Sequence, residues 1–157
     1  MEDSISEEKE TTREICSIGG DDSKVVKRAI DNHGIIQNFI ECKVFEFCEF
    51  LGVRLVPTVF SHDETYSEIV VEKVSEYTSE IDVTKLLFYP EAFHDYPGEL
   101  YKLVENWTKL AVLGIMINPY YNYNYGVDKD GNVLITDSGK LLYLLNYEDF
   151  KKKLKER

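Results

Sequence analysis

A short strand, a tight turn and a second strand are predicted between residues 124 and 139, and this segment constrains the fold more than any other. The pair Asp130-Gly131 is a strong hairpin turn signal, and the Val-Leu-Ile run at 133–135 is typical of a strand. Such a hairpin brings Asn124 and Asp137 to the same end of two paired strands. An amide and a carboxylate so placed suit a metal-bound phosphate, although Asn, Gly and Asp are also ordinary turn residues.

Two further elements are predicted upstream of this hairpin. Residues 24–30 are typical of a strand and carry Lys27 in a Val-Val-Lys context. Residues 36–51 have apolar side chains at helical spacing, and Gly52 is well placed to end the helix. This predicted helix contains Glu41.

In this order the elements resemble the protein-kinase fold, in which a Val-Ala-Ile-Lys strand precedes a helix and a catalytic-loop Asn precedes an Asp-Phe-Gly triplet. The corresponding triplet here is Asp137-Ser138-Gly139. The resemblance implies that Glu41 orients Lys27 on the phosphates of ATP. It also implies that Asn124 and Asp137 hold Mg²⁺.

The remaining elements fit the same plan. Strands are predicted at 55–60 and 66–74 with a turn at 61–65, and the resemblance places adenine near 71–74. A long helix is predicted from Pro97, with one apolar face that includes Trp107 as a core anchor and extends to Ile117.

The sequence therefore predicts an α+β protein with a minimal protein-kinase-like, two-lobed fold. A small antiparallel N-lobe sheet with one helix is expected at 12–77, and a reduced helical C-lobe at 78–157. Residues 1–11 are expected to form a disordered acidic tail. The hydrophobic content of 43% is typical of a globular chain, so a single compact domain is expected.

Several residues depart from the kinase pattern. Pro119 stands five residues before Asn124, where the family has its catalytic aspartate, and residues 110–127 contain no Asp or Glu. The glycine-rich loop is reduced to Gly19-Gly20, followed by two aspartates that would face the phosphates. Residues 140–157 leave no room for an activation segment. These departures indicate that the chain does not catalyse ordinary hydroxyl phosphorylation.

The leading hypothesis is a pseudokinase-type binding or regulatory module with weak or no ATP binding. A second is a small acidic inhibitor or decoy of a host protein, because small kinase-like chains of this sort resemble phage-encoded proteins. A third is an atypical small phosphotransferase, which would take its base from Asp128 or Asp130.

Charge and composition restrict the partners. The formal net charge is −11, and because the first ten residues sum to −4 and the last seven to +4, the body carries the whole excess. An acidic body disfavours nucleic acid and anionic membranes, so we expect a protein partner. The tyrosine-rich run at 119–125 is a candidate contact, with Tyr120, Tyr121 and Tyr123 either exposed to that partner or packed on the core.

The cysteines indicate a reducing compartment. Cys16, Cys42 and Cys48 form no Cys-x-x-Cys pair, and the three histidines are scattered, so no Cys/His metal site is expected. The sequence carries no signal-peptide pattern and no apolar run of membrane-spanning length. We therefore expect a cytoplasmic protein with free thiols.

Overall fold

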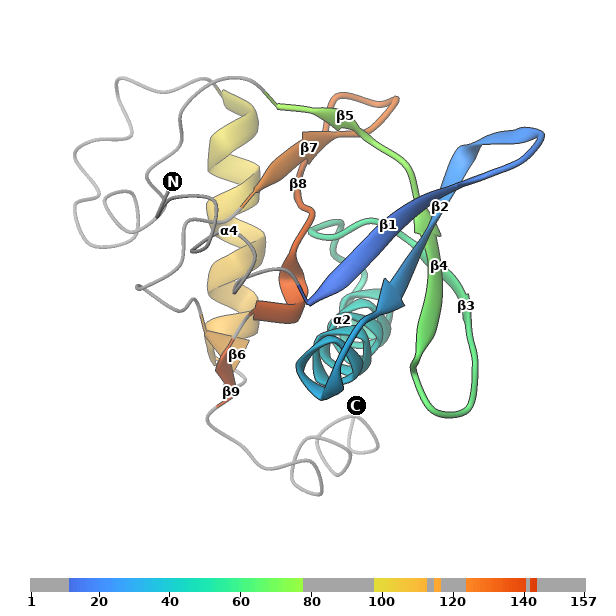
Figure 1. Cartoon of the computed structure of the whole chain (residues 1–157). Helices are drawn as coiled ribbons and strands as arrows, with labels where there is room; N and C mark the ends of the chain where they lie inside the picture. Colours follow the sequence, from blue (N-terminus) through green and yellow to red (C-terminus); the bar gives the residue numbers. More distant parts are fainter. Residues whose placement is uncertain (1–11, 78–97, 113–114, 117–123, 141, 144–157) are drawn as a thin grey trace, which may run out of the picture.

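A four-stranded antiparallel sheet forms one side of the structure. The computed structural model describes residues 12–77, 98–112, 115–116, 124–140 and 142–143 (Figure 1). Strands β1 (Arg13–Ile18), β2 (Asp21–Ala29), β3 (Val59–His62) and β4 (Glu68–Glu72) pair in the order β1-β2-β4-β3. Gly20 has a φ of 81°, which a glycine adopts without strain, and so allows the tight turn between β1 and β2.

Helix α2 (Asn32–Leu51) packs on one face of this sheet, mainly on β2 and β4. Its first turn is capped by Asp31, whose carboxylate accepts a hydrogen bond from the Gly34 N–H. Gly52 ends the helix in the left-handed conformation, with a φ of 71°. The helix and its glycine stop confirm the sequence prediction.

The second half of the structure contains one long helix and two small sheets. Helix α4 is Gly98–Val112. Strands β5 (Ser75–Glu76), β7 (Tyr125–Val127) and β8 (Val133–Ile135) form one sheet, and β6 (Ile115–Met116) pairs with β9 (Leu142–Tyr143). A 3₁₀ turn, η2 (Ser138–Lys140), follows β8 and contacts α2. In Figure 1 α4 lies opposite the four-stranded sheet, with α2 and η2 between them.

The main core joins α2, α4 and β8. Trp107 is 1% exposed and belongs to this core, as the sequence predicted. A smaller cluster of Cys42, Ile69 and Val71 packs between α2 and the sheet. Buried members of the main core include Val44, Phe47, Leu55, Leu103, Leu110 and Ile135.

The class is α+β with a small antiparallel sheet and two helices, as expected, but several element boundaries differ, most clearly those of the strand predicted at 55–60 and of the helix predicted from Pro97. The strand predicted from Leu55 begins only at Val59, because Leu55 and Val56 are buried in the core and Pro57 has no N–H to donate to a ladder. The helix predicted to extend to Ile117 ends at Val112, and residues 115–116 form β6 instead. Ile117 itself, the N-terminal tail and the lysine-rich C-terminal run lie outside the described residues.

Candidate functional site

Lys27 and Glu41 form a buried ion pair. The Lys27 ammonium lies 2.8 Å from Glu41 Oε2 and donates a second hydrogen bond, also 2.8 Å, to the backbone oxygen of Thr136. The two charged side chains are only 9% and 5% exposed. The structure thus brings together the lysine and glutamate that the sequence paired, and it adds the residue next to Asp137.

Strand alternation and helix position explain this meeting. In β2 Lys27 pairs in register with Ile69, which is buried beneath α2, so Lys27 points to the face that the helix covers. Glu41 lies on the buried side of α2. Burial alone would raise the pKa of the Glu41 carboxyl, but the charges of Lys27 and Arg13 and their hydrogen bonds hold it below its ordinary value.

Arg13 is the second cation on Glu41, and sequence reasoning missed it. Its Nη1 lies 3.1 Å from Glu41 Oε1 and 3.0 Å from the side-chain oxygen of Asn38. The Arg13 side chain is 9% exposed. We call Arg13, Lys27 and Glu41 the Glu41 cluster. The local sequence does not single out Arg13, because its place depends on the pairing of β1 with β2. In that pairing Arg13, at the start of β1, lies opposite Ala29 at the end of β2.

The Asp137 carboxylate is bound to the backbone of Asn124. The Asn124 N–H donates to Asp137 Oδ1 at 3.0 Å, and the Thr136 N–H donates to the Asn124 oxygen at the same distance. Asp137 is buried, whereas the Asn124 side chain is exposed. Gly139 packs so closely on α2 that a Cβ there would meet the Gln37 oxygen at 2.6 Å. The segment 136–139 is therefore fixed against the helix that carries Glu41.

The oxygen atoms of Asp137 and Asn124 suit a magnesium ion only if a ligand supplies further oxygen atoms. Within the described ranges, no group of three or more His, Cys, Asp and Glu side chains could hold a metal ion. Asp137 and Asn124 supply one carboxylate and one amide. Magnesium is commonly bound by one or two carboxylates together with phosphate oxygens, so the donor set fits Mg²⁺ delivered with a nucleotide.

Asp128 has a structural role in the β7–β8 turn. Its carboxylate accepts hydrogen bonds from the N–H groups of Asp130 and Asn132, both 2.9 Å, from the Asn132 amide and from Arg54. Burial opposes ionisation, but these bonds outweigh it and hold the Asp128 pKa below its ordinary value. A carboxylate so occupied is a poor general base. Asp130 lies exposed in the same turn.

Arg54 is the second residue that sequence reasoning missed. Its guanidinium binds both oxygens of Glu72, at 2.7 and 2.9 Å, and Asp128 at 3.0 Å, so it connects β4 with the β7–β8 turn. The backbone oxygen of Arg54 also accepts from Asn106 on α4. We call Arg54, Glu72 and Asp128 the Arg54 cluster. Glu72 belongs to the 71–74 segment, where the kinase resemblance places adenine.

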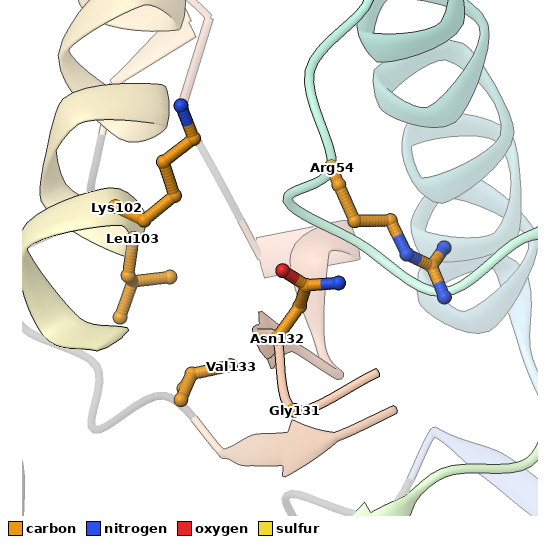
Figure 2. Close-up of a pocket in the computed structure, with 6 residues that line it drawn as sticks. All are labelled: Arg54, Lys102, Leu103, Gly131, Asn132 and Val133. Carbon is orange, nitrogen blue, oxygen red and sulfur yellow. The ribbon is translucent and has the colours of Figure 1, made fainter. Parts of the chain in front are cut away.

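A small pocket lies beside the Arg54 cluster. It has a volume of about 40 Å³, which suffices for roughly three water molecules and not for a nucleotide. Figure 2 shows the Asn132 amide between Arg54 and the α4 residues, with the Arg54 guanidinium pointing away from Lys102. The pocket is lined by Arg54, Lys102, Leu103, Gly131, Asn132 and Val133.

The other candidates are placed as follows. Pro119, Tyr120, Tyr121 and Tyr123 lie outside the described residues. The three cysteines are free, and burial raises the pKa of the Cys42 and Cys48 thiols to about 12, so neither is a nucleophile at neutral pH.

Neither the protein-family models nor the curated protein sequences contain a match to this chain. Among the helices that the structure describes, none combines the length and apolar character needed to span a bilayer.

Proposed function

We propose that the chain is a kinase-like module of pseudokinase type, which binds a nucleotide weakly and acts through protein contacts rather than by phosphate transfer. The observation that carries this proposal is the position of the Lys27 ammonium, 2.8 Å from both Glu41 and the Thr136 oxygen. A cation oriented by a helix glutamate and adjacent to Asp137 is the arrangement that a kinase-like fold uses for nucleotide phosphates.

The exposed side chain of Ile15 on β1 favours a ligand with an apolar portion. Ile15 pairs in register with Lys27, so both side chains belong to the same face of the sheet. Ile15 is 60% exposed although it is apolar. An aromatic base could cover it while the phosphates meet Lys27, and Asp137 with Asn124 would hold the accompanying Mg²⁺.

The same residues argue against phosphate transfer. Residue 119 is a proline, and the carboxylate of Asp128 is occupied by Arg54 and its own turn. A hydroxyl acceptor would then lack a base to take its proton. We therefore expect no labelled product when the protein is incubated with γ-labelled ATP and general acceptors.

Thermal unfolding with and without ATP and Mg²⁺ tests the binding part of this proposal. At a ligand concentration ten times Kd, the midpoint should rise by about 3–6 °C. The rise should disappear in Asp137→Asn and persist in Asp130→Asn, an exposed carboxylate of the same hairpin. If millimolar nucleotide leaves the wild-type midpoint unchanged, nucleotide binding is ruled out as the role of this site.

A second candidate is supported by charge alone: a small acidic inhibitor or decoy on the same scaffold. The net charge of −11 favours docking on a basic partner surface. In that case Lys27→Ala and Asp137→Asn should leave partner binding unchanged. Reversal of exposed acids, or Tyr121→Ala and Tyr123→Ala, should abolish it.

A further inference from the structure

Arg13 lies in β1, and contacts at the start of this strand and at Asn38 fix the direction of its side chain. The start of β1 is held by a 2.8 Å hydrogen bond from the Ile30 N–H to the Thr12 oxygen. The Asn38 amide nitrogen donates to the Tyr66 oxygen at 2.9 Å, which leaves the Asn38 oxygen to accept from Arg13. Arg13 therefore reaches Glu41 from a position that does not depend on Lys27.

The Glu41 cluster contains one more positive charge than its single carboxylate neutralises. Arg13 takes Oε1 of Glu41 and Lys27 takes Oε2, so two cations share one carboxylate. In a pair made of lysine and glutamate alone, the two charges cancel and leave no net positive charge for an anionic ligand. With Arg13 in place, the cluster keeps one positive charge beside the ligand site.

We propose that Arg13 holds Glu41 in position and neutralises it, so that the Lys27 ammonium keeps its contact with Glu41 and exchanges the Thr136 oxygen for a polyphosphate ligand. Arg13 is then a positioning residue for an anion site, and the ligand class is a nucleoside polyphosphate or inorganic triphosphate. This inference rests on the proposed nucleotide binding for its ligand, but its charge-compensation step can be tested in the ligand-free protein.

The ligand-free test compares two substitutions by their unfolding midpoints. Lys27→Met removes one cation and leaves Glu41 paired with Arg13, so we expect only a small fall in the midpoint. Glu41→Ala leaves both cations without an anion and should lower the midpoint far more. If Lys27→Met is as damaging as Glu41→Ala, Arg13 does not compensate Glu41 and the proposal is wrong, whatever the ligand.

The ligand test measures the Kd of ATP with Mg²⁺, and of inorganic triphosphate, by calorimetric titration. In Arg13→Gln the Lys27 ammonium is the one counter-ion left to Glu41 among the described residues, so the net charge of the cluster falls to zero and binding should weaken by about tenfold or more. Arg13→Lys keeps the charge and should stay closer to the wild type. The matched control is Arg28→Gln, an exposed arginine on the neighbouring strand β2, which should not change Kd.

A recovery experiment separates positioning from a merely structural role. Adding Glu41→Gln to Arg13→Gln restores the net charge of +1 beside Lys27, so affinity should recover at least in part. If the wild type binds and folded Arg13→Gln binds equally well, Arg13 has no such role while the proposed function stands. If the wild type binds neither probe, the proposed function fails first and the ligand step fails with it.

Discussion

The Glu41 cluster and the Arg54 cluster are built on the same plan with opposite signs. In one, a single carboxylate lies between two cations; in the other, a single guanidinium lies between two carboxylates. The Glu41 cluster therefore carries a net charge of +1 and the Arg54 cluster −1. The two clusters differ most in how many of their hydrogen-bonding groups remain available to a ligand.

Every nitrogen of the Arg54 guanidinium has an acceptor in the protein. Nε binds Asp128, Nη2 binds both oxygens of Glu72, and Nη1 binds the Val56 oxygen and the Thr58 hydroxyl. A saturated network of this kind stabilises one arrangement and offers nothing to a ligand. The Glu41 cluster instead holds one cation more than its carboxylate neutralises, beside the segment that carries Asp137, and the proposed anion site depends on this excess charge.

The largest expected effect is that of Glu41→Ala, which tests whether the Glu41 cluster depends on its single anion. Arg13 and Lys27 would be left buried with no carboxylate between them, and the free energy of unfolding should fall by about 3–5 kcal/mol. Urea denaturation measures this directly. Glu46→Ala is the matched control, because Glu46 lies exposed on the same helix and pairs only with Lys43 among the described residues. A loss equal to that of Glu46→Ala would show that the two cations are hydrated.

The next effect is that of Asp128→Ala in the Arg54 cluster. The change removes the acceptor of two turn N–H groups and one of the two anions of Arg54, and it should lower the free energy of unfolding by about 2–3 kcal/mol. It should not change nucleotide affinity. Asp130→Ala, two residues further along the same turn and exposed, serves as the control. If Asp128→Ala weakened nucleotide binding, the separation between a structural and a binding cluster would be lost.

Acid should weaken both clusters. The pKa values of Glu41 and Asp128 lie below the ordinary 4.5 and 3.8, so each carboxylate stabilises the fold above its ordinary pKa. That stabilisation is lost as the pH falls through these values towards the lower folded-state pKa. Midpoints recorded from pH 7 to pH 3 should fall most steeply below about 4.5. Glu41→Gln should flatten part of that fall; an unchanged profile would place the titration elsewhere.

The smallest effect is expected from an exposed ion pair. Arg28 and Glu68 lie 2.6 Å apart across β2 and β4, with both side chains 47% exposed. Water screens such a pair and holds its partners almost as well, so Glu68→Gln should leave the unfolding midpoint unchanged within error. A clear fall in the midpoint would mean that a short ion-pair distance, without burial, is enough to explain how the Glu41 and Arg54 clusters stabilise the fold.

Local patterns predicted much of the fold. The Asp130-Gly131 turn, the Gly52 helix stop and the Val-Leu-Ile strand each depend on residues that are neighbours in sequence, and the structure confirms all three. The meeting of Lys27 and Glu41 was also anticipated, because the order of elements resembles a known family. The nucleotide and metal roles of these residues stay predictions.

The rest depends on contacts that local patterns do not encode. Arg54 reaches Asp128 across 74 positions, and Arg13 reaches Glu41 across 28. Leu55 and Val56 have strand-like side chains, but tertiary packing buries them in the core outside the strand β3, and the Leu55 oxygen accepts a hydrogen bond from the Ile135 N–H of β8 instead. Asp128 looked available as a base because a sequence does not show which acids their own turns occupy.

The hydrogen bond from Lys27 to the Thr136 oxygen joins residues 109 positions apart, and this separation has a consequence for synthesis on the ribosome. At a translation rate of about 5–20 residues per second, roughly 5–20 s pass between the appearance of Lys27 and that of its partner. During that interval β1, β2 and α2 exist without the segment that completes their polar interior. Lys27 can meet Glu41 early, because the two are only 14 positions apart, but its second acceptor is absent until nearly the whole of the described chain has been made.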